Sequence, residues 1–112
     1  MEIKTKEFKR VTRVSIFERI DSEIGARVLE ETLASITLYN SFKIVVNMEG
    51  VRYLSSRGIR ALINAKKECR RWNRGDLVLC NVPVDIKEAF LLFGVTSLFK
   101  VYESETEAVG SF

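Results

Sequence analysis

The sequence predicts a small α/β domain with a mixed central β-sheet. Short apolar segments of strand type alternate with segments whose apolar residues recur at helical spacing, which indicates strands connected by helices. The first two strand segments have no helix between them, so they are expected to pair antiparallel and to make the sheet a mixed one. With 112 residues, 46% of them hydrophobic and 29% charged, the chain is expected to form one domain over residues 1–112.

The individual elements follow from local patterns. Strands are expected at residues 3–8, 11–17, 42–48, 77–80 and 98–102. Helices are expected at about residues 22–38, 56–73 and 84–93, with a last short helix after the capping residue Ser104. Asp21 or Ser22 would cap the first helix, Gly75 would end the second, and Pro83 would open the third. The helices are expected to cover the apolar central strands and to pack mainly on one face of the sheet.

Two consecutive serines mark the start of the second predicted helix. Ser55 and Ser56 precede the apolar stripe that begins with Ile59 and Leu62. A serine at this position accepts a hydrogen bond from a backbone N–H of the first turn, and a helix N-terminus favours an anion. From spacing alone, a structural cap is favoured over a phosphate-accepting residue. The turn also follows a buried-type strand, and open α/β sheets usually place their sites at the carboxyl ends of strands.

The composition excludes several kinds of catalytic site. The chain contains no histidine, which removes nucleophile activation by imidazole and histidine-containing zinc sites. Its two cysteines, Cys69 and Cys80, lack the close spacing of a metal or redox motif and are interpreted as reduced core residues. No complete set of nucleophile, base and stabilising group can be assembled, so we expect no catalytic residue, metal or cofactor.

Neither a secretory leader nor a membrane segment is predicted. Basic residues interrupt the amino-terminal segment, so it does not form the apolar region of a signal peptide. No apolar run approaches the roughly 20 residues that span a bilayer. We therefore expect a cytoplasmic protein without membrane insertion, and a monomer by default.

Positive charge is concentrated along the second predicted helix, although the net charge of the chain is only +3. Within that segment Glu68 is the one opposing acidic residue. The basic residues are Arg57, Arg60, Lys66, Lys67, Arg70, Arg71 and Arg74. A solvated face is the plain interpretation. If the face is functional, an acidic patch on a protein partner is favoured over nucleic acid, because the overall charge is low and no nucleic-acid-binding motif is present.

The stretch around the two serines also carries a family resemblance. Asn47-Met48-Glu49 ends an apolar strand, and an aliphatic turn then leads through Ser55-Ser56 to the helix start Gly58-Ile59. Farther along, Phe93-Gly94-Val95 precedes the final strand segment, and Asp21 lies before the first helix. This pattern resembles the STAS domain, which is shared by sulphate transporters and anti-sigma-factor antagonists. The resemblance extends over nearly the whole chain and implies a single STAS-like domain.

The resemblance implies partner switching, not catalysis. Antagonists of this family bind an anti-sigma factor, itself commonly a serine kinase, and so release the sigma factor that it was holding. Phosphorylation by that kinase ends the interaction, and a serine phosphatase restores it. The family's phosphorylated residue lies two positions before the glycine of the helix start, which is Ser56 in this chain. Well-understood antagonists carry Asp immediately before that residue, whereas this chain has Ser55.

The surface that docks the anti-sigma factor is expected around Ser56. Its expected members are Asp21, Tyr53, Leu54, Ser55, Arg57, Gly58, Arg60 and Leu91. Packing is the safer expectation for Tyr53, for Trp72 and for the run Leu91 to Phe93, although an exposed Leu91 would serve as an apolar anchor. Two alternatives remain: an accessory subunit of a membrane transporter, with Ser56 only as a cap, and a small nucleotide- or anion-binding sensor that uses the start of the second helix.

Overall fold

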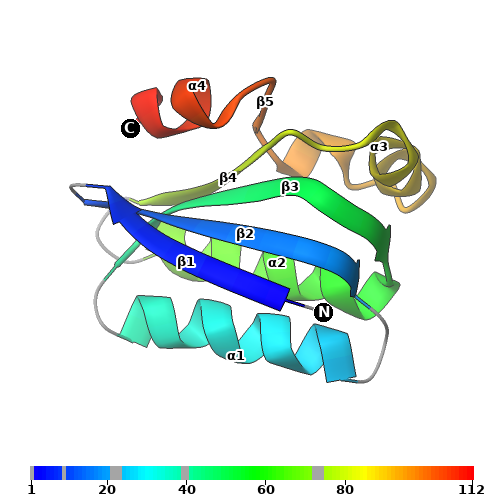
Figure 1. The fold of residues 1–112 in the computed structure, drawn as a ribbon, viewed down its shortest axis with the longest axis horizontal. Coiled ribbons are helices and arrows are strands. Elements are labelled where there is room, and N and C mark those ends of the chain that lie inside the picture. Colours follow the sequence, from blue (N-terminus) through cyan, green and yellow to red (C-terminus); the bar gives the residue numbers. More distant parts are fainter. Residues whose placement is uncertain (1, 9, 21–23, 39–40, 72–74) are drawn as a thin grey trace.

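A five-stranded mixed sheet separates two helical layers of unequal size (Figure 1). The computed structural model describes residues 2–8, 10–20, 24–38, 41–71 and 75–112. The strands lie in the order β1 (Glu2–Phe8), β2 (Val11–Ile20), β3 (Lys43–Leu54), β4 (Asp76–Cys80) and β5 (Val101–Tyr102). β1 pairs antiparallel with β2, and every later pair is parallel. The predicted α/β class and mixed sheet are therefore confirmed.

The helices cover the two faces of the sheet unequally. α1 (Ile24–Leu38) and α2 (Ser56–Arg71) lie side by side under one face, which we call the inner face. α4 (Glu105–Gly110) lies on the other, outer face, and α3 (Val84–Leu92) lies beside the end of β3 (Figure 1). Most of the helical mass is thus on one face, as the sequence predicts.

The main core fills the space between the inner face and the helices α1 and α2. Alternate strand residues such as Val14, Ile44 and Val46 point into it. Leu29 and Leu33 of α1 and Leu62 of α2 meet them and are essentially inaccessible to solvent. Burying an aliphatic side chain of this size contributes roughly 1.5–3 kcal/mol before the entropy cost of ordering it. This layer therefore supplies most of the hydrophobic stabilisation and fixes the position of α2.

The core on the outer face is smaller. Its buried members are Val11, Val45, Val78 and Cys80 from the sheet and Ala108 from α4. Ala108 is the one buried residue of α4. The helix begins at Ser104, whose Oγ accepts a hydrogen bond from the Glu107 N–H at 3.2 Å, as the capping pattern predicts.

Three strands differ in length from the prediction, and β2 is one of them, because it continues from residue 17 to Ile20. β3 continues from residue 48 to Leu54, and this extension pairs with β2 across two register shifts. Gly50 permits the pairing, because a Cβ at that position would lie 2.8 Å from Cδ1 of Phe17. The predicted strand over residues 98–102 is wrong in extent: β5 covers only Val101–Tyr102, since residues 96–98 form a 3₁₀ turn closed by a hydrogen bond from the Leu98 N–H to the Val95 carbonyl.

The ends of the predicted helices agree with the structure where it describes them. Pro83 precedes α3, and Gly94, with a φ of +68°, follows it. Gly75 follows the α2 region, and its N–H donates a hydrogen bond to the Cys69 carbonyl at 3.0 Å; glycine is required there because a Cβ would overlap the carbonyl oxygen of Phe42. The predicted caps Asp21 and Ser22, and Trp72, lie outside the described residues.

Both cysteines are free and buried, Cys69 on α2 and Cys80 on β4. Burial raises the pKa of each thiol to about 12, so neither forms much reactive thiolate near neutral pH. The interpretation of both as reduced core residues is confirmed. Within the part of the chain that the structure describes, no helix has the length and apolar character required to cross a membrane.

Candidate functional site

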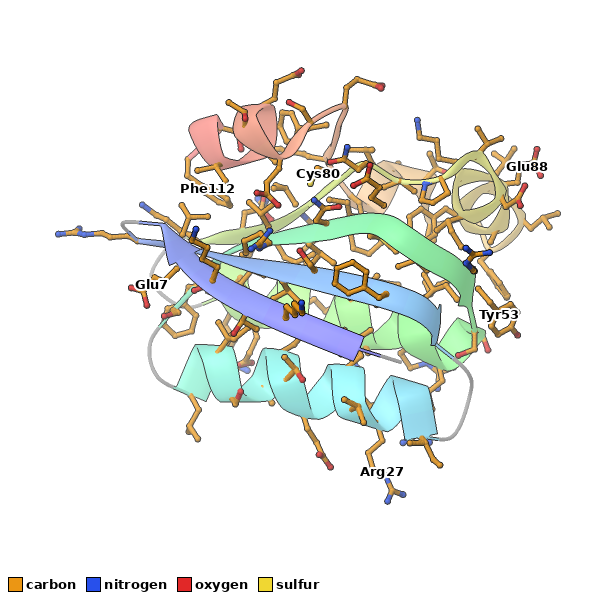
Figure 2. All side chains as sticks on the ribbon, viewed as in Figure 1. Glu7, Arg27, Tyr53, Cys80, Glu88 and Phe112 are labelled. Carbon is orange, nitrogen blue, oxygen red and sulfur yellow. The ribbon has the colours of Figure 1, made fainter. Side chains whose placement is uncertain are left out.

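The turn between β3 and α2 lies at the end of the sheet where β2, β3 and β4 all finish (Figure 1). Tyr53 and Leu54 end β3, Ser55 makes the connection, and α2 begins at Ser56. Figure 2 shows Tyr53 at the same end of the sheet as Glu88 of α3. The predicted serine turn and the third helix, which are far apart in the sequence, therefore lie at the same end of the sheet.

The two serines of this turn have different environments. Ser55 is only 5% exposed; its Oγ accepts a hydrogen bond from the Gly58 N–H at 3.1 Å, and its carbonyl accepts one from the Ile59 N–H at 2.9 Å. Ser55 is thus the N-cap of α2. Ser56 is exposed, and its hydroxyl has no hydrogen-bond partner among the described residues. The spacing allows either serine to be the cap, and the structure shows that Ser55 is. The Ser56 hydroxyl therefore remains accessible.

The electrostatic surroundings of Ser56 favour a negative charge. The first turn of α2 contains no acidic residue, so the helix's own side chains leave the partial positive charge of its start without an offsetting carboxylate. Arg60 is exposed and lies one helical turn after Ser56, on the same side of the helix. Arg57 is half-exposed, and its Nε lies 3.2 Å from Oε1 of Glu30 on α1. This ion pair ties the start of α2 to the neighbouring helix.

α3, which contacts β3, carries an exposed apolar surface. Leu91 and Leu92 of α3 are 71% and 86% exposed, and Val84 and Phe93 are also largely accessible. The prediction that Leu91, Leu92 and Phe93 pack in the core is therefore wrong. α3 buries only Ile86 and Phe90, and the Phe90 ring stacks on Phe99 with centroids 5.5 Å apart, so the remaining apolar residues face outward.

The other predicted docking residues divide by burial. Leu54 and Gly58 are buried and belong to the scaffold of the turn, like Ser55. Tyr53 is 42% exposed, which contradicts its interpretation as a packing residue. Asp21 lies outside the described residues. Ser56, Tyr53, Arg60 and Leu91, together with the half-exposed Arg57, are thus the members with substantial accessible surface.

Comparison with known proteins identifies the family of the chain. Residues 2–108 match the STAS domain family. The chain belongs to the STAS domain family. A curated relative in Bordetella bronchiseptica, BtrV, described as a candidate anti-sigma factor antagonist, is 27% identical over 99 residues that make up 88% of this STAS domain and 84% of the relative.

Solved structures share the fold. The crystal structure of an anti-sigma factor antagonist from Mycobacterium paratuberculosis is similar with a TM-score of 0.86 and 17% identity, covering 98% of this STAS domain and 92% of that chain. The Bacillus cell fate determinant SpoIIAA in its phosphorylated form is similar with a TM-score of 0.75 and 14% identity, covering 98% of each chain.

The basic residues on α2 of this STAS domain have acidic partners that sequence order conceals. Lys66 Nζ lies 2.6 Å from Oδ1 of Asp76, Arg70 lies 3.6 Å from Oδ2 of the same carboxylate, and Arg57 is paired with Glu30. Glu68 is the one acidic residue within the segment, but three of its cations are also paired with carboxylates from α1 and β4. The positive charge of this face is therefore partly compensated, although Arg60, Lys67 and Arg70 remain exposed.

A second polar group, which the sequence did not reveal, fastens α4 to the sheet. Glu105 Oε1 accepts hydrogen bonds from Arg13 at 3.2 Å and from the Asn47 side-chain amide at 3.0 Å. The side-chain oxygen Oδ1 of Asn47 in turn accepts a hydrogen bond from the Glu49 N–H at 3.0 Å. Asn47 belongs to the family pattern, but nothing in its spacing predicts the hydrogen bond to Glu105. Across the residues described, no cluster of histidine, cysteine or carboxylate side chains could hold a metal ion.

Proposed function

We propose that this STAS domain is an anti-sigma factor antagonist that works by partner switching. It binds an anti-sigma factor with serine kinase activity, phosphorylation of Ser56 by that kinase ends the binding, and a serine phosphatase restores it. The domain acts by binding and not by catalysis. The observation that carries the proposal is the division of roles between the buried cap Ser55 and the exposed Ser56. The likeness to BtrV and to the fold of phosphorylated SpoIIAA supports it.

The chemistry of the switch follows from the position of Ser56. A phosphate adds roughly 1.5 to 2 negative charges at neutral pH. The Ser56 hydroxyl takes no part in the cap, so its modification leaves the hydrogen bond between Ser55 and Gly58 intact. The helix start and Arg60 favour the added charge. The fold is therefore retained, and the dianion acts by breaking complementarity with a partner docked over Ser56.

The proposed docking surface combines a polar centre and an apolar flank. Ser56 and Arg60 form the polar centre, with Tyr53 beside them and Leu91 as the apolar anchor. Leu54, Ser55 and Gly58 are buried beneath this surface and hold the turn in place. Arg57 supports it through its ion pair with Glu30. Asp21, the acidic residue before α1, is the last proposed member. Contiguous exposed apolar residues such as those of α3 are typical of protein interfaces, in which a few central residues supply most of the affinity.

The test is a binding series with the anti-sigma factor captured from native cells. We expect Ser56→Ala to bind like the wild type, because the interface loses only a hydroxyl. Ser56→Asp should bind at least about tenfold more weakly, since an unpaired charge is buried against the partner. Ser35→Asp provides the matched control, because Ser35 is an exposed serine near the far end of α1. Equal affinity of correctly folded Ser56→Asp and wild type would contradict the proposal.

A further inference from the structure

A hollow at the end of the sheet opposite Ser56 has the properties of a small-molecule site. It is lined by Glu7 of β1, by Arg10 and Val11 at the start of β2, by Lys43 at the start of β3 and by the end of α4, and its volume is about 840 Å³. Figure 2 shows Glu7 and Phe112, two of its lining residues, at the end of the sheet away from Tyr53. Ligand sites usually enclose about 300–1,000 Å³ and combine an apolar lining with a few polar groups.

The hollow lies beside α4, a short helix that packs on the outer face through the small side chain of Ala108. Ala108 is the residue of α4 that packs directly on the sheet. Val109 is half-buried beside it, and Phe112 remains partly exposed after the helix has ended. Together with Val11 on β2, these two side chains form the apolar wall of the hollow. An acyl chain would cover that wall and remove its apolar surface from water.

The rim of the hollow carries more positive than negative charge. Arg10 and Lys43 line it together with one carboxylate, that of Glu7. Among the described residues, neither Arg10 nor Lys43 has an ion-pair partner. Two cations beside a single carboxylate, at the edge of an apolar wall, are complementary to an anionic head group on an apolar chain.

We propose that this hollow binds a single-chain amphiphile with a carboxylate head, the chemistry of a medium-chain fatty acid. The chain lies along Val11, Val109 and Phe112, and the carboxylate is held by Arg10 and Lys43. Glu7 limits the affinity by repelling the head group. The site is independent of the partner switch, because it lies at the other end of the sheet from Ser56.

The experiment is isothermal titration of the full chain with decanoate below its micelle concentration, and with decyltrimethylammonium as the probe of opposite charge. We expect saturable one-to-one binding of decanoate and at least about tenfold weaker binding of the cation, since the head group exchanges an attractive contact for a repulsive one. Lys43→Glu should weaken decanoate binding by a similar factor. Glu7→Gln should strengthen it.

Three controls make the outcome decisive. Arg27→Glu reverses a charge on α1, where Figure 2 shows Arg27 directed away from the sheet, and should leave decanoate binding unchanged. Val109→Trp should block the hollow, with retention of fold checked by circular dichroism. Ser56→Asp should bind decanoate like the wild type, which separates this site from the partner switch. Absence of saturable binding, equal binding of both amphiphiles, or equal effects of Lys43→Glu and Arg27→Glu would overturn the proposal.

Discussion

The two faces of the sheet differ in how they are covered, and the difference separates stability from function. The inner face is covered by two long helices that bury leucines such as Leu29 and Leu62 completely. The outer face is covered by a six-residue helix that buries one alanine, Ala108. The thick layer holds α2 in place and so defines the Ser56 turn. The thin layer leaves a hollow and is fastened largely by the polar contacts of Glu105.

The same contrast appears on a smaller scale in the serine pair. Ser55 belongs to the packed layer, because its side chain is buried and caps α2. Ser56, the next residue, belongs to the surface. A switch of this kind needs both properties at one turn: a rigid support, and a hydroxyl that is accessible to another protein. The following substitutions test whether these assignments are correct.

The largest effect is expected from core truncation on the inner face. Leu62→Ala should lower the free energy of unfolding by about 2–5 kcal/mol, because it removes a fully buried side chain and leaves a cavity. The matched pair is Val46→Ala on the inner face and Val78→Ala on the outer face, and Val78→Ala should cost less because the thin layer over it relaxes more readily into the cavity. Urea denaturation measures all of these values. Equal costs of the two valine substitutions would show that the outer face is packed as tightly as the inner one.

A smaller effect is expected when α4 is released. Glu105→Ala removes the acceptor shared by Arg13 and Asn47 and should cost about 1–3 kcal/mol. Hydrogen exchange sharpens the comparison, because the amides of α4 should then exchange faster while those of α2 keep their protection. Faster exchange throughout α2 would mean that the two layers unfold as one unit.

The serine pair should respond unequally to substitution. Ser55→Ala should cost about 1 kcal/mol through loss of the N-cap, whereas Ser56→Ala should change stability by less than about 0.5 kcal/mol. Ser55→Asp restores the residue found in well-understood antagonists and should preserve stability, because aspartate caps helices as well as serine does. Chemical denaturation measures all three. A larger cost for Ser56→Ala than for Ser55→Ala would reverse the assignment of cap and free hydroxyl.

The smallest effect compares the two thiols. Burial raises the pKa of Cys69 and Cys80 alike to about 12, so both should react slowly with iodoacetamide at pH 8 and faster as the pH rises, because the thiolate is the reactive form. Cys80 lies under α4 and Cys69 lies in the thick layer. Peptide-resolved alkylation should therefore find Cys80 modified several-fold faster. Equal rates would contradict the weaker attachment of α4.

Local patterns predicted most of the fold, and tertiary contacts account for what they missed. Residues adjacent in the sequence determine three features that were predicted: the apolar core strands, the capped start of α2 and the cap of α4 at Ser104. The exposure of Leu91 and Leu92 depends on how little of α3 the sheet covers, which spacing does not reveal. In the same way, Asp76 reaches Lys66 and Arg70 only because β4 returns beside α2.

The candidate site was predictable in position but not in its division of roles. The turn from Tyr53 to Gly58 was identified from the serine pair and the family pattern. Either serine satisfied the spacing of a cap, and only the hydrogen bond from the Gly58 N–H to Ser55 Oγ distinguished them. The ion pair between Arg57 and Glu30 joins residues on different helices, so no local pattern indicates it.

The most direct test of the central claim is peptide-resolved mass spectrometry of the chain isolated from its native cells, together with identification of the proteins captured with it. The partner-switching account predicts a phosphate on Ser56, none on Ser55, and an anti-sigma factor with serine kinase activity bound only to the unmodified form. Phosphate on Ser55, or an unmodified chain held by a transporter ATPase, would contradict it.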